Sequence, residues 1–302
     1  MKNNPNHLHK FLSLSEFHKM FGLPKPEHPL VSFIRLEDMT LPENLSDQMV
    51  LDFYKIAYKD TIGSAKYGQH HYDFGEGGLV FTAPGQLFEK PKNNKSKGFL
   101  ILVHPDFLLS YPLAKKIRQY GFFSYSTDEA LQVSEKEKEI LFSVFRIIEE
   151  ELQSRTDDFS QNVVISQLEL LLNYSSRYYK RQFITYKAVN DHLIEKFEKV
   201  LDDFFNDEEK LEKGMPTVQE VADQLNISPS YLSDMLRSLT GLNTQQHIHN
   251  RFVEKAKEIL STTDWSVSQI AYHMGFDYPQ SFTRLFKSKT NQTPLEFRQS
   301  FN

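Results

Sequence analysis

Residues 217–241, TVQEVADQLNISPSYLSDMLRSLTG, and residues 266–291, SVSQIAYHMGFDYPQSFTRLFKSKTN, decide the fold of the C-terminal part of this chain. Each stretch opens with a hydroxyl residue followed three positions later by Glu or Gln: Thr217 with Glu220, and Ser266 with Gln269. Such a pair is typical of a capping box at the start of a helix. Apolar residues then recur at helical spacing. The two stretches are therefore interpreted as copies of one unit, a short helix, a tight turn and a second helix.

The second helix of each unit is expected to expose a polar face. Its expected cap is Ser228 in the first unit and Asp277 in the second, and a proline follows within the first turn, where no backbone donor is lost. Once the apolar residues face inward, the outward residues are Ser230, Ser233, Asp234 and Arg237 in the first unit, and Gln280, Ser281, Arg284 and Lys287 in the second. This is the form of a helix-turn-helix that reads the major groove of DNA.

A longer set of residues carries a family resemblance. It comprises Ala222, Leu225, Ile227, Ser228, Tyr231, Leu232 and Gly241, then Arg251, Ala256 and Leu260 on the connecting helix, and Ile270, Ala271, Gly275, Phe276, Asp277, Phe282, Arg284, Phe286, Lys287, Thr293, Pro294 and Arg298. In these residues the chain resembles the AraC/XylS family of bacterial transcription regulators, over roughly its last third. Two departures are Asn291, where glycine is usual, and Phe297, where tyrosine is usual. Because Asn tolerates a left-handed backbone, the turn is expected to survive.

The resemblance implies roles for the outward residues. Gln280, Ser281 and Arg284 would contact bases in the second unit, and Ser230, Ser233 and Asp234 in the first, with Arg to guanine and Gln to adenine as the expected pairs. Arg237, Lys287 and the helix N-termini after Ser228 and Asp277 would hold phosphates. Asp234 has an alternative role as an ion-pair partner of Arg237, one turn further along the same helix.

Composition excludes several chemistries and raises one objection. The chain has no cysteine, which excludes disulfides, thiolate metal sites, cysteine nucleophiles and the alkyl-transferring DNA repair proteins that use a similar module. The net charge is −5, and from Gly214 onward the eight Lys and Arg residues are balanced by eight Asp and Glu residues. DNA-binding domains are usually basic, so the placement of the cations must create the attractive face. With neither a signal peptide nor a membrane-length apolar run, we expect a cytoplasmic protein without a membrane partner.

The first part of the chain follows a different pattern. Residues 1–29 are expected to form an arm, and residues 30–130 a domain of short strands bounded by glycines, which favours a small antiparallel barrel or jelly roll. The segments GGLVFTAPGQ and KGFLILVHPDFL resemble the cupin-like sensing domain of many family members. The predicted fold class is therefore α+β, with a cupin-like barrel and a helical hairpin followed by an all-α domain.

The barrel domain offers candidate ligands of two kinds. His70 and His71 are adjacent on an expected strand, so their side chains point to opposite faces and cannot share a metal ion. Glu76 follows them, and a metal site that combines one of these residues with His104 is the alternative to our expectation of no metal and no cofactor. Aromatic residues are able to line an effector pocket or to form the core: Tyr54, Tyr58, Tyr67, Tyr72, Phe81 and Phe88.

Two further regions complete the domain organisation. Residues 131–184 read as two amphipathic helices, the first opened by a capping box of Ser134 and Glu137. They suit a homodimer contact, as is common in the family, or a hairpin that packs only on its own barrel. Residues 185–302 are the expected AraC-type DNA-binding domain, with helix-turn-helix units at about 217–241 and 266–291.

The resulting hypothesis is a sequence-specific DNA-binding transcriptional regulator rather than an enzyme. Its expected partners are double-stranded DNA, a small-molecule effector in the first domain, a second copy of the chain and, for an activator, RNA polymerase. The alternatives are a cupin-type metal-dependent enzyme with an accessory helical domain and an interaction scaffold that binds no DNA. A metal content would favour the first alternative, and a lack of salt-dependent duplex binding the second.

Overall fold

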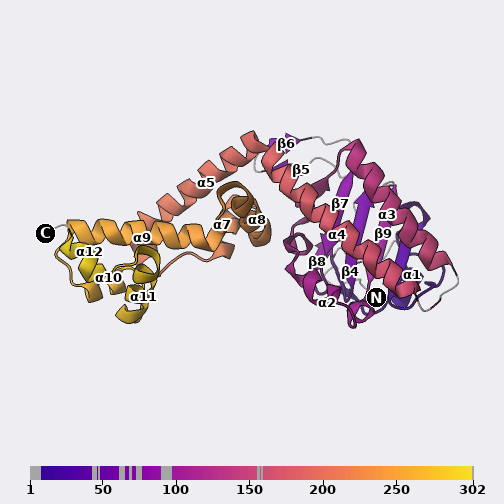
Figure 1. Ribbon diagram of the computed structural model, residues 1–302, viewed down its shortest axis with the longest axis horizontal. Helices are drawn as coiled ribbons and strands as arrows, with labels where there is room; N and C mark the ends of the chain where they lie inside the picture. Colours follow the sequence, from indigo (N-terminus) through magenta and orange to yellow (C-terminus); the bar gives the residue numbers. More distant parts are fainter. Residues whose placement is uncertain are drawn as a thin grey trace, which may run out of the picture. The chain divides into compact units, whose positions relative to one another are not determined.

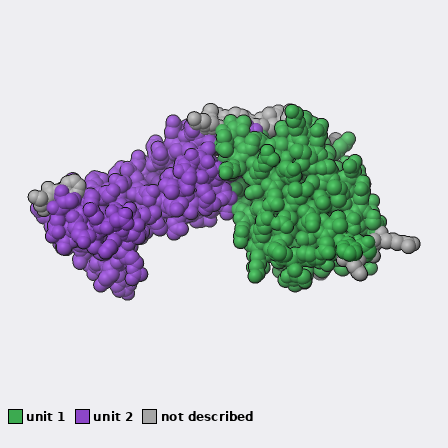
Figure 2. All heavy atoms as spheres, viewed as in Figure 1, with its two compact units in different colours: residues 1–185 green, residues 186–302 purple. Residues whose placement is uncertain are grey.

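The protein forms two compact units, Met1–Thr185 and Tyr186–Asn302. They are coloured separately in Figure 2. The computed structural model describes residues 8–42, 46, 48–60, 65–67, 70–72, 77–89, 97–154, 157 and 159–300, without the side chains of residues 65–67, 70–72, 89 and 187–189. Within these residues, no helix is both long enough and apolar enough to cross a membrane.

The first unit mixes strands and helices, which confirms the predicted α+β class at this level. Its largest sheet has the order β10-β7-β4-β9-β2, with every neighbouring pair antiparallel. A smaller sheet has the order β1-β3-β8, and β5 pairs with β6. The strands are β1 (His9–Phe11), β2 (Val31–Arg35), β3 (Gln48–Leu51), β4 (Tyr54–Lys59), β5 (Ala65–Tyr67), β6 (His70–Tyr72), β7 (Gly78–Thr82), β8 (Leu87–Glu89), β9 (Gly98–Val103) and β10 (Leu131–Gln132).

The described strands do not close into the expected barrel. A closed barrel needs an unbroken ladder of strand pairs, whereas β2 and β10 each pair with a single neighbour and leave the five-stranded sheet open at both edges. The two sheets instead enclose a core between them. In this core, Ala57 of β4 and Leu100 of β9 lie in one cluster with Met49 and Leu51 of β3.

Two long helices cover the other face of the five-stranded sheet. They are α3 (Glu135–Gln153) and α4 (Ser160–Thr185), and Figure 1 shows both running across the strands. The capping box of Ser134 and Glu137 is present and confirmed. Phe145 of α3 contacts Phe99 of β9 at a ring distance of 5.5 Å, so the apolar stripe of α3 is buried against the sheet. The remaining helical segments are α1 (Leu14–Met20), η1 (Leu36–Asp38), η2 (Pro105–Leu108), α2 (Leu113–Lys116), η3 (Ile117–Gln119), η4 (Gly121–Ser124) and η5 (Thr127–Glu129).

The second unit is all helical in its described residues. Its helices are α5 (Lys187–Phe205), α6 (Glu208–Leu211), α7 (Val218–Leu225), α8 (Pro229–Thr240), α9 (Thr244–Thr262), α10 (Val267–His273), α11 (Pro279–Thr290) and α12 (Pro294–Gln299). The long helix α9 packs against α8, which precedes it in the chain, and against α10, α11 and α12, which follow it. In Figure 1, α7 and α8 lie near one end of α9 and α12 near the other.

Candidate nucleic-acid interface

The first helix-turn-helix unit, α7 to α8, follows the predicted local chemistry. The Thr217 hydroxyl accepts a hydrogen bond from the Glu220 amide and the Glu220 carboxylate accepts one from the Thr217 amide, so the capping box is confirmed. Asn226 ends α7 in the left-handed conformation, with φ of 56°. Ser228 caps α8 by accepting from the Tyr231 amide at 3.2 Å, as predicted. The turn is therefore fixed by residues within three or four positions of one another.

The second unit, α10 to α11, agrees with the prediction at its start and its end. The capping box of Ser266 and Gln269 is present. Asn291 ends α11 with φ of 61°, so it takes the left-handed conformation expected of the usual glycine. The apolar residues Phe282 and Phe286 are fully buried. Both units thus expose only one face of their second helix.

The predicted cap at Asp277 is wrong. The capping position of α11 belongs to Tyr278, and no side chain accepts a hydrogen bond from the first amides of the helix. The reason is the proline at position 279, which occupies the first helical position and so moves the cap one residue beyond Asp277. Asp277 is left as an exposed carboxylate before the helix.

Helix α9 connects the two helix-turn-helix units through contacts near each of its ends. At its start, the Thr244 hydroxyl, on a fully buried residue, lies 3.0 Å from the Ser233 hydroxyl of α8. Near its end, Arg298 of α12 donates to the Leu260 carbonyl at 3.1 Å and to the Trp265 carbonyl at 2.6 Å. A helix of 19 residues spans about 28 Å. The two reading helices are thus fixed on one rigid spacer.

The predicted base-contacting residues of the second unit lie on the surface. Gln280, Ser281 and Arg284 are all exposed on α11. Within the described residues, none of their side chains makes a hydrogen bond or an ion pair. Their position one turn apart puts Gln280 and Arg284 on the same strip of the helix. This strip is available for contact with another molecule.

The predicted base-contacting residues of the first helix-turn-helix unit make more contacts within the protein. Ser230, Ser233 and Asp234 are each partly buried. The Ser233 hydroxyl contacts Thr244, as described above, and the Asp234 carboxylate pairs with Arg237 at 3.1 Å. The sequence alternative of an Asp234–Arg237 pair is therefore present in the structure. The two reading helices are not equivalent surfaces, because α8 has internal partners where α11 has none among the described residues.

The placement of cations answers the objection from net charge. From Gly214 onward, most Lys and Arg side chains have an internal partner: Arg237 with Asp234, Arg251 with Asp202, Lys255 with Glu258, Lys257 with Glu254, Lys289 with Asn250, and Arg298 with backbone carbonyls. Two cations of this stretch have neither a hydrogen bond nor an ion pair with the described residues, Arg284 and Lys287. Both lie on α11. The uncompensated positive charge is thus concentrated on the second reading helix.

Sequence reasoning missed Tyr278 as a surface residue of the interface. Its side chain is 69% exposed and immediately precedes α11. An exposed aromatic residue with a hydroxyl at this point is able to donate to a phosphate or pack on a base edge. The signal in the sequence was the proline at 279, which moves the start of the helix and brings Tyr278 to the capping position.

In the compact unit Met1–Thr185, the aromatic residues predicted to bind an effector do not lie around one pocket. Tyr54, Tyr58 and Phe81 are buried on the face of the five-stranded sheet that α3 and the η4 segment cover, where Tyr58 contacts Phe142 and Phe81 contacts Phe122. Phe88 lies on the opposite side, in the core between the two sheets. The side chains of Tyr67 and Tyr72 lie outside the described residues. Their role in effector binding stays a prediction.

The histidines proposed as alternative metal ligands are not brought together in the described part of the chain. His104 caps η2 by accepting from the Asp106 amide at 3.3 Å. The side chains of His70, His71 and Glu76 lie outside the described residues. Among the described residues, no three His, Asp or Glu side chains are grouped as metal ligands.

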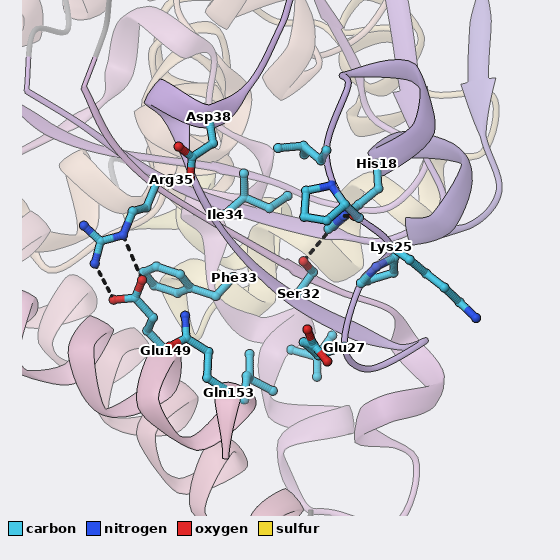
Figure 3. A pocket seen from close by; sticks show the side chains of 15 residues that line it. His18, Lys25, Glu27, Ser32, Phe33, Ile34, Arg35, Asp38, Glu149 and Gln153 are labelled. Carbon is cyan, nitrogen blue, oxygen red and sulfur yellow. Dashed lines mark hydrogen bonds and ion pairs between the residues drawn. The ribbon is translucent and has the colours of Figure 1, made fainter. Parts of the chain in front are cut away.

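A pocket of about 420 Å³ lies along the edge strand β2 in the first unit. Figure 3 shows Arg35 and Glu149 on one side of it and His18 and Ser32 on the other. Arg35 donates two hydrogen bonds to the Glu149 carboxylate, at 2.8 and 2.9 Å. His18 is 5% exposed, and its Nε2 lies 2.8 Å from the Ser32 hydroxyl. Since Arg35 and Glu149 neutralise each other, the pocket does not present a charge of one sign to a ligand.

Comparison with known proteins locates the same C-terminal region. A family model described as a helix-turn-helix domain matches residues 221–300. The HTH-type transcriptional activator RhaS of Escherichia coli O157:H7 is 31% identical over 140 residues, which cover 46% of this chain and 46% of RhaS. Histidine kinase P4 of Formosa agariphila is 22% identical over 143 residues, which cover 47% of this chain and 10% of the kinase. The chain therefore spans less than half the length of these relatives.

Among solved structures, the C-terminal domain of the two-component response regulator yesN from Fusobacterium nucleatum is 27% identical, with a TM-score of 0.29. This similarity covers 33% of the present chain and 96% of the yesN domain. The family match over residues 221–300 coincides with α8 to α12 and the second half of α7. The chain therefore has a C-terminal helix-turn-helix domain that includes both reading helices and is similar to those of AraC-type transcription regulators.

Proposed function

We propose that this protein is a sequence-specific DNA-binding transcriptional regulator. The observation that carries the proposal is the outer face of α11, where Gln280, Ser281 and Arg284 are exposed and have no internal partners among the described residues. An exposed Arg, Gln and Ser on one helix face are the side chains that pair with base edges in the major groove. Such a surface has no evident structural purpose, because the residues that stabilise α11 lie on its other side.

The two reading helices divide the work in this proposal. On α11, Arg284 contacts guanine and Gln280 contacts adenine, while Lys287 binds a phosphate. No side chain accepts from the start of α11, and the Ser281 amide donates to the Tyr278 carbonyl at 2.9 Å, so the Gln280 amide is open to a second phosphate. On α8, Ser230, Ser233 and Asp234 face the adjacent major groove and Arg237 holds the backbone, together with the Ser228 end of the helix. The α8 contacts contribute less, because Ser233 and Arg237 must first leave their internal partners.

The partners of the whole protein belong to the same proposal. Regulation by a small-molecule effector is assigned to the first compact unit, Met1–Thr185, whose sequence resembles a cupin-like sensing domain. A homodimer would form through α3 and α4, whose surfaces expose Ile140, Ile147 and Leu170. An activator of this kind would contact RNA polymerase. The protein would be located in the cytoplasm. RhaS, a transcriptional activator by its name, supports this direction for the shared C-terminal region.

The test is duplex binding by the full chain. Genomic fragments retained by the protein would first supply a duplex, and its affinity would then be measured against salt for the wild type and for the double variant Arg284→Ala/Lys287→Ala. We expect a loss of about a hundredfold or more, because both a base contact and a phosphate contact are removed. The matched control is Lys199→Ala, an exposed lysine of α5 away from both reading helices, which should change affinity by less than about twofold.

Two results would overturn the proposal. One is the absence of retained fragments at low ionic strength, which is where phosphate contacts are strongest. The other is an affinity in Arg284→Ala/Lys287→Ala equal to that of the wild type, since the proposed interface would then lie elsewhere.

A further inference from the structure

Strand β4 places two lysines on the face of its sheet that points into the core of the first unit. The register pairs Lys55 with Leu102 and Thr82, and Ala57 with Leu100 and Val80. Directly opposed residues of neighbouring strands project to the same face of a sheet. Ala57, Leu100 and Leu102 belong to the core cluster between the two sheets. Lys55 and Lys59, two residues to either side of Ala57, therefore face that core as well.

Contacts across the core confirm this orientation for Lys55. Its ammonium lies 4.0 Å from the ring centroid of Phe88, which belongs to β8 in the opposite sheet. Neither Lys55 nor Lys59 forms an ion pair or a hydrogen bond within the described residues. Lys55 is densely surrounded by protein although part of its surface remains accessible. The lysine is thus reachable from outside but poorly solvated.

Both lysines are held in an unfavourable environment for a charge. Burial, and to a smaller extent the nearby ammonium of Lys59, lowers the pKa of Lys55 to about 7. Burial also lowers the pKa of Lys59. Two like charges without a counter-ion in such surroundings oppose folding, whereas an anion placed between them would restore the lost solvation. A surface lysine would have no such need.

A third polar group stands beside Lys55. Thr82 of β7 is 4% exposed and lies directly opposite Lys55 in the strand register. Its hydroxyl is able to donate a hydrogen bond to an acceptor placed beside Lys55. Around Lys59 the flanking positions are Gly78 and Gly98. A Cβ at Gly98 would lie 2.1 Å from the Tyr58 carbonyl oxygen and 3.2 Å from the Lys59 Cα, so β9 passes close to β4 beside this lysine.

We propose that Lys55, Lys59 and Thr82 form a binding site for the oxyanion of a small effector, a carboxylate or a phosphate group. The two ammonium groups neutralise the anion, the Thr82 hydroxyl donates a hydrogen bond to it, and the Phe88 ring packs against an apolar part of the same molecule. The site depends on strand register, because only alternate residues of β4 reach the inner face. The role of this site in binding an effector rests on the proposed function as a regulator. The binding of an anion by these residues does not depend on that function.

The experiment is calorimetric titration of the full chain, without DNA, with sodium phosphate and in parallel with sodium benzoate, against sodium chloride of matched ionic strength. We expect saturable binding of one of the two oxyanions at a single site. The affinity should fall at least tenfold in Lys55→Met and in Lys59→Met. The matched control is Lys115→Met, since Lys115 is an exposed lysine of α2 that makes no ion pair with the described residues.

The outcomes separate clearly. The Met variants are expected to fold, and thermal unfolding should show a higher Tm for Lys55→Met, because it removes a poorly solvated ammonium while keeping its volume. Phosphate binding without benzoate binding assigns a phosphorylated effector, and the reverse assigns a carboxylate. Equal affinity in the wild type and both lysine variants, or no saturable binding beyond chloride, overturns the site. Oxyanion binding by a chain that retains no DNA would remove the regulatory function and leave the site standing.

Discussion

Asp234 and Arg237 face each other one turn apart on α8, with the Asp234 carboxylate 3.1 Å from the Arg237 guanidinium. Arg237 is 57% exposed at its side chain and Asp234 is 31% exposed. In the protein without DNA, the one arginine of the first reading helix is thus neutralised by a neighbour on the same helix. Asp234 would also repel phosphates if the pair opened.

Asp234→Asn should therefore tighten DNA binding. The substitution frees Arg237 and removes a negative charge from the interface, and we expect an affinity gain of roughly twofold to tenfold with a salt slope about one unit steeper. Binding to a retained duplex at several salt concentrations measures both quantities. A weaker affinity confined to one base position would instead assign Asp234 to a cytosine amino group.

The two unpartnered cations of α11 should have distinguishable roles. Arg284→Ala is expected to cost about 1 to 3 kcal/mol of binding free energy and to relax preference at one base position. Lys287→Ala should weaken binding to all sequences alike and reduce the salt slope by about one. Affinity measurements over a set of single-base variants of the duplex separate the two. Unchanged preference in Arg284→Ala would contradict its role as a base contact.

Gly275 should be far less tolerant of a side chain than Gly241. Both have a left-handed backbone, with φ of 78° and 80°. A Cβ at Gly275 would lie 2.2 Å from the Gly214 amide nitrogen and 2.3 Å from its Cα, whereas a Cβ at Gly241 would meet no atom within 4 Å. We expect Gly241→Ala to destabilise the second unit by about 1 kcal/mol and Gly275→Ala by more than about 3 kcal/mol.

Thermal and urea unfolding of the two alanine variants provide the measurement. Since both substitutions share the backbone strain, their difference isolates the steric contact between the turn at Gly275 and the segment at Gly214. Equal losses in the two variants would show that this segment moves aside.

The stability of the first unit should decrease in mild acid because of His18. Burial lowers the pKa of His18 and outweighs the opposing effect of its hydrogen bond to the Pro24 carbonyl. The unfolded chain takes up the proton near pH 6.5 and the native protein only at lower pH. The free energy of unfolding should thus fall as the pH drops below about 6.5, by at most about 1.4 kcal/mol per pH unit.

The corresponding measurement is Tm between pH 7.5 and 5 for the wild type and for His18→Gln. The variant retains a donor and an acceptor but does not titrate, so its Tm should depend less on pH in this range. Parallel curves for the two proteins would assign the acid sensitivity to other groups.

Local chemistry explains why the C-terminal domain was predictable. The capping boxes of Thr217 with Glu220 and Ser266 with Gln269 involve residues three positions apart, and the left-handed conformation of Asn291 depends on that residue alone. Interactions of such short range are visible in the order of the residues. The misplaced cap at Asp277 arose where two local rules competed, because a proline two positions later fixed the start of the helix.

The residues that form the surface of the interface could not be predicted in the same way, because they depend on contacts between residues far apart in the chain. The ion pair of Arg251 with Asp202 joins residues on α9 and α5, and the contact of Ser233 with Thr244 joins α8 to α9. Partners so far apart in the chain meet only when the helices pack. The sequence therefore supplied a list of cations, and packing selected Arg284 and Lys287 as the ones without a partner among the described residues.

The order of amino acids alone determined the two helix-turn-helix units and the presence of an α+β first domain, because helix caps, helical periodicity and strand alternation are properties of neighbouring residues. Tertiary structure decided that the five-stranded sheet stays open, that Tyr54 and Phe88 lie on opposite faces of it, and that Lys55 and Lys59 point into the core. These features depend on strand register and on which sheets face each other, and a shift by one residue would reverse them.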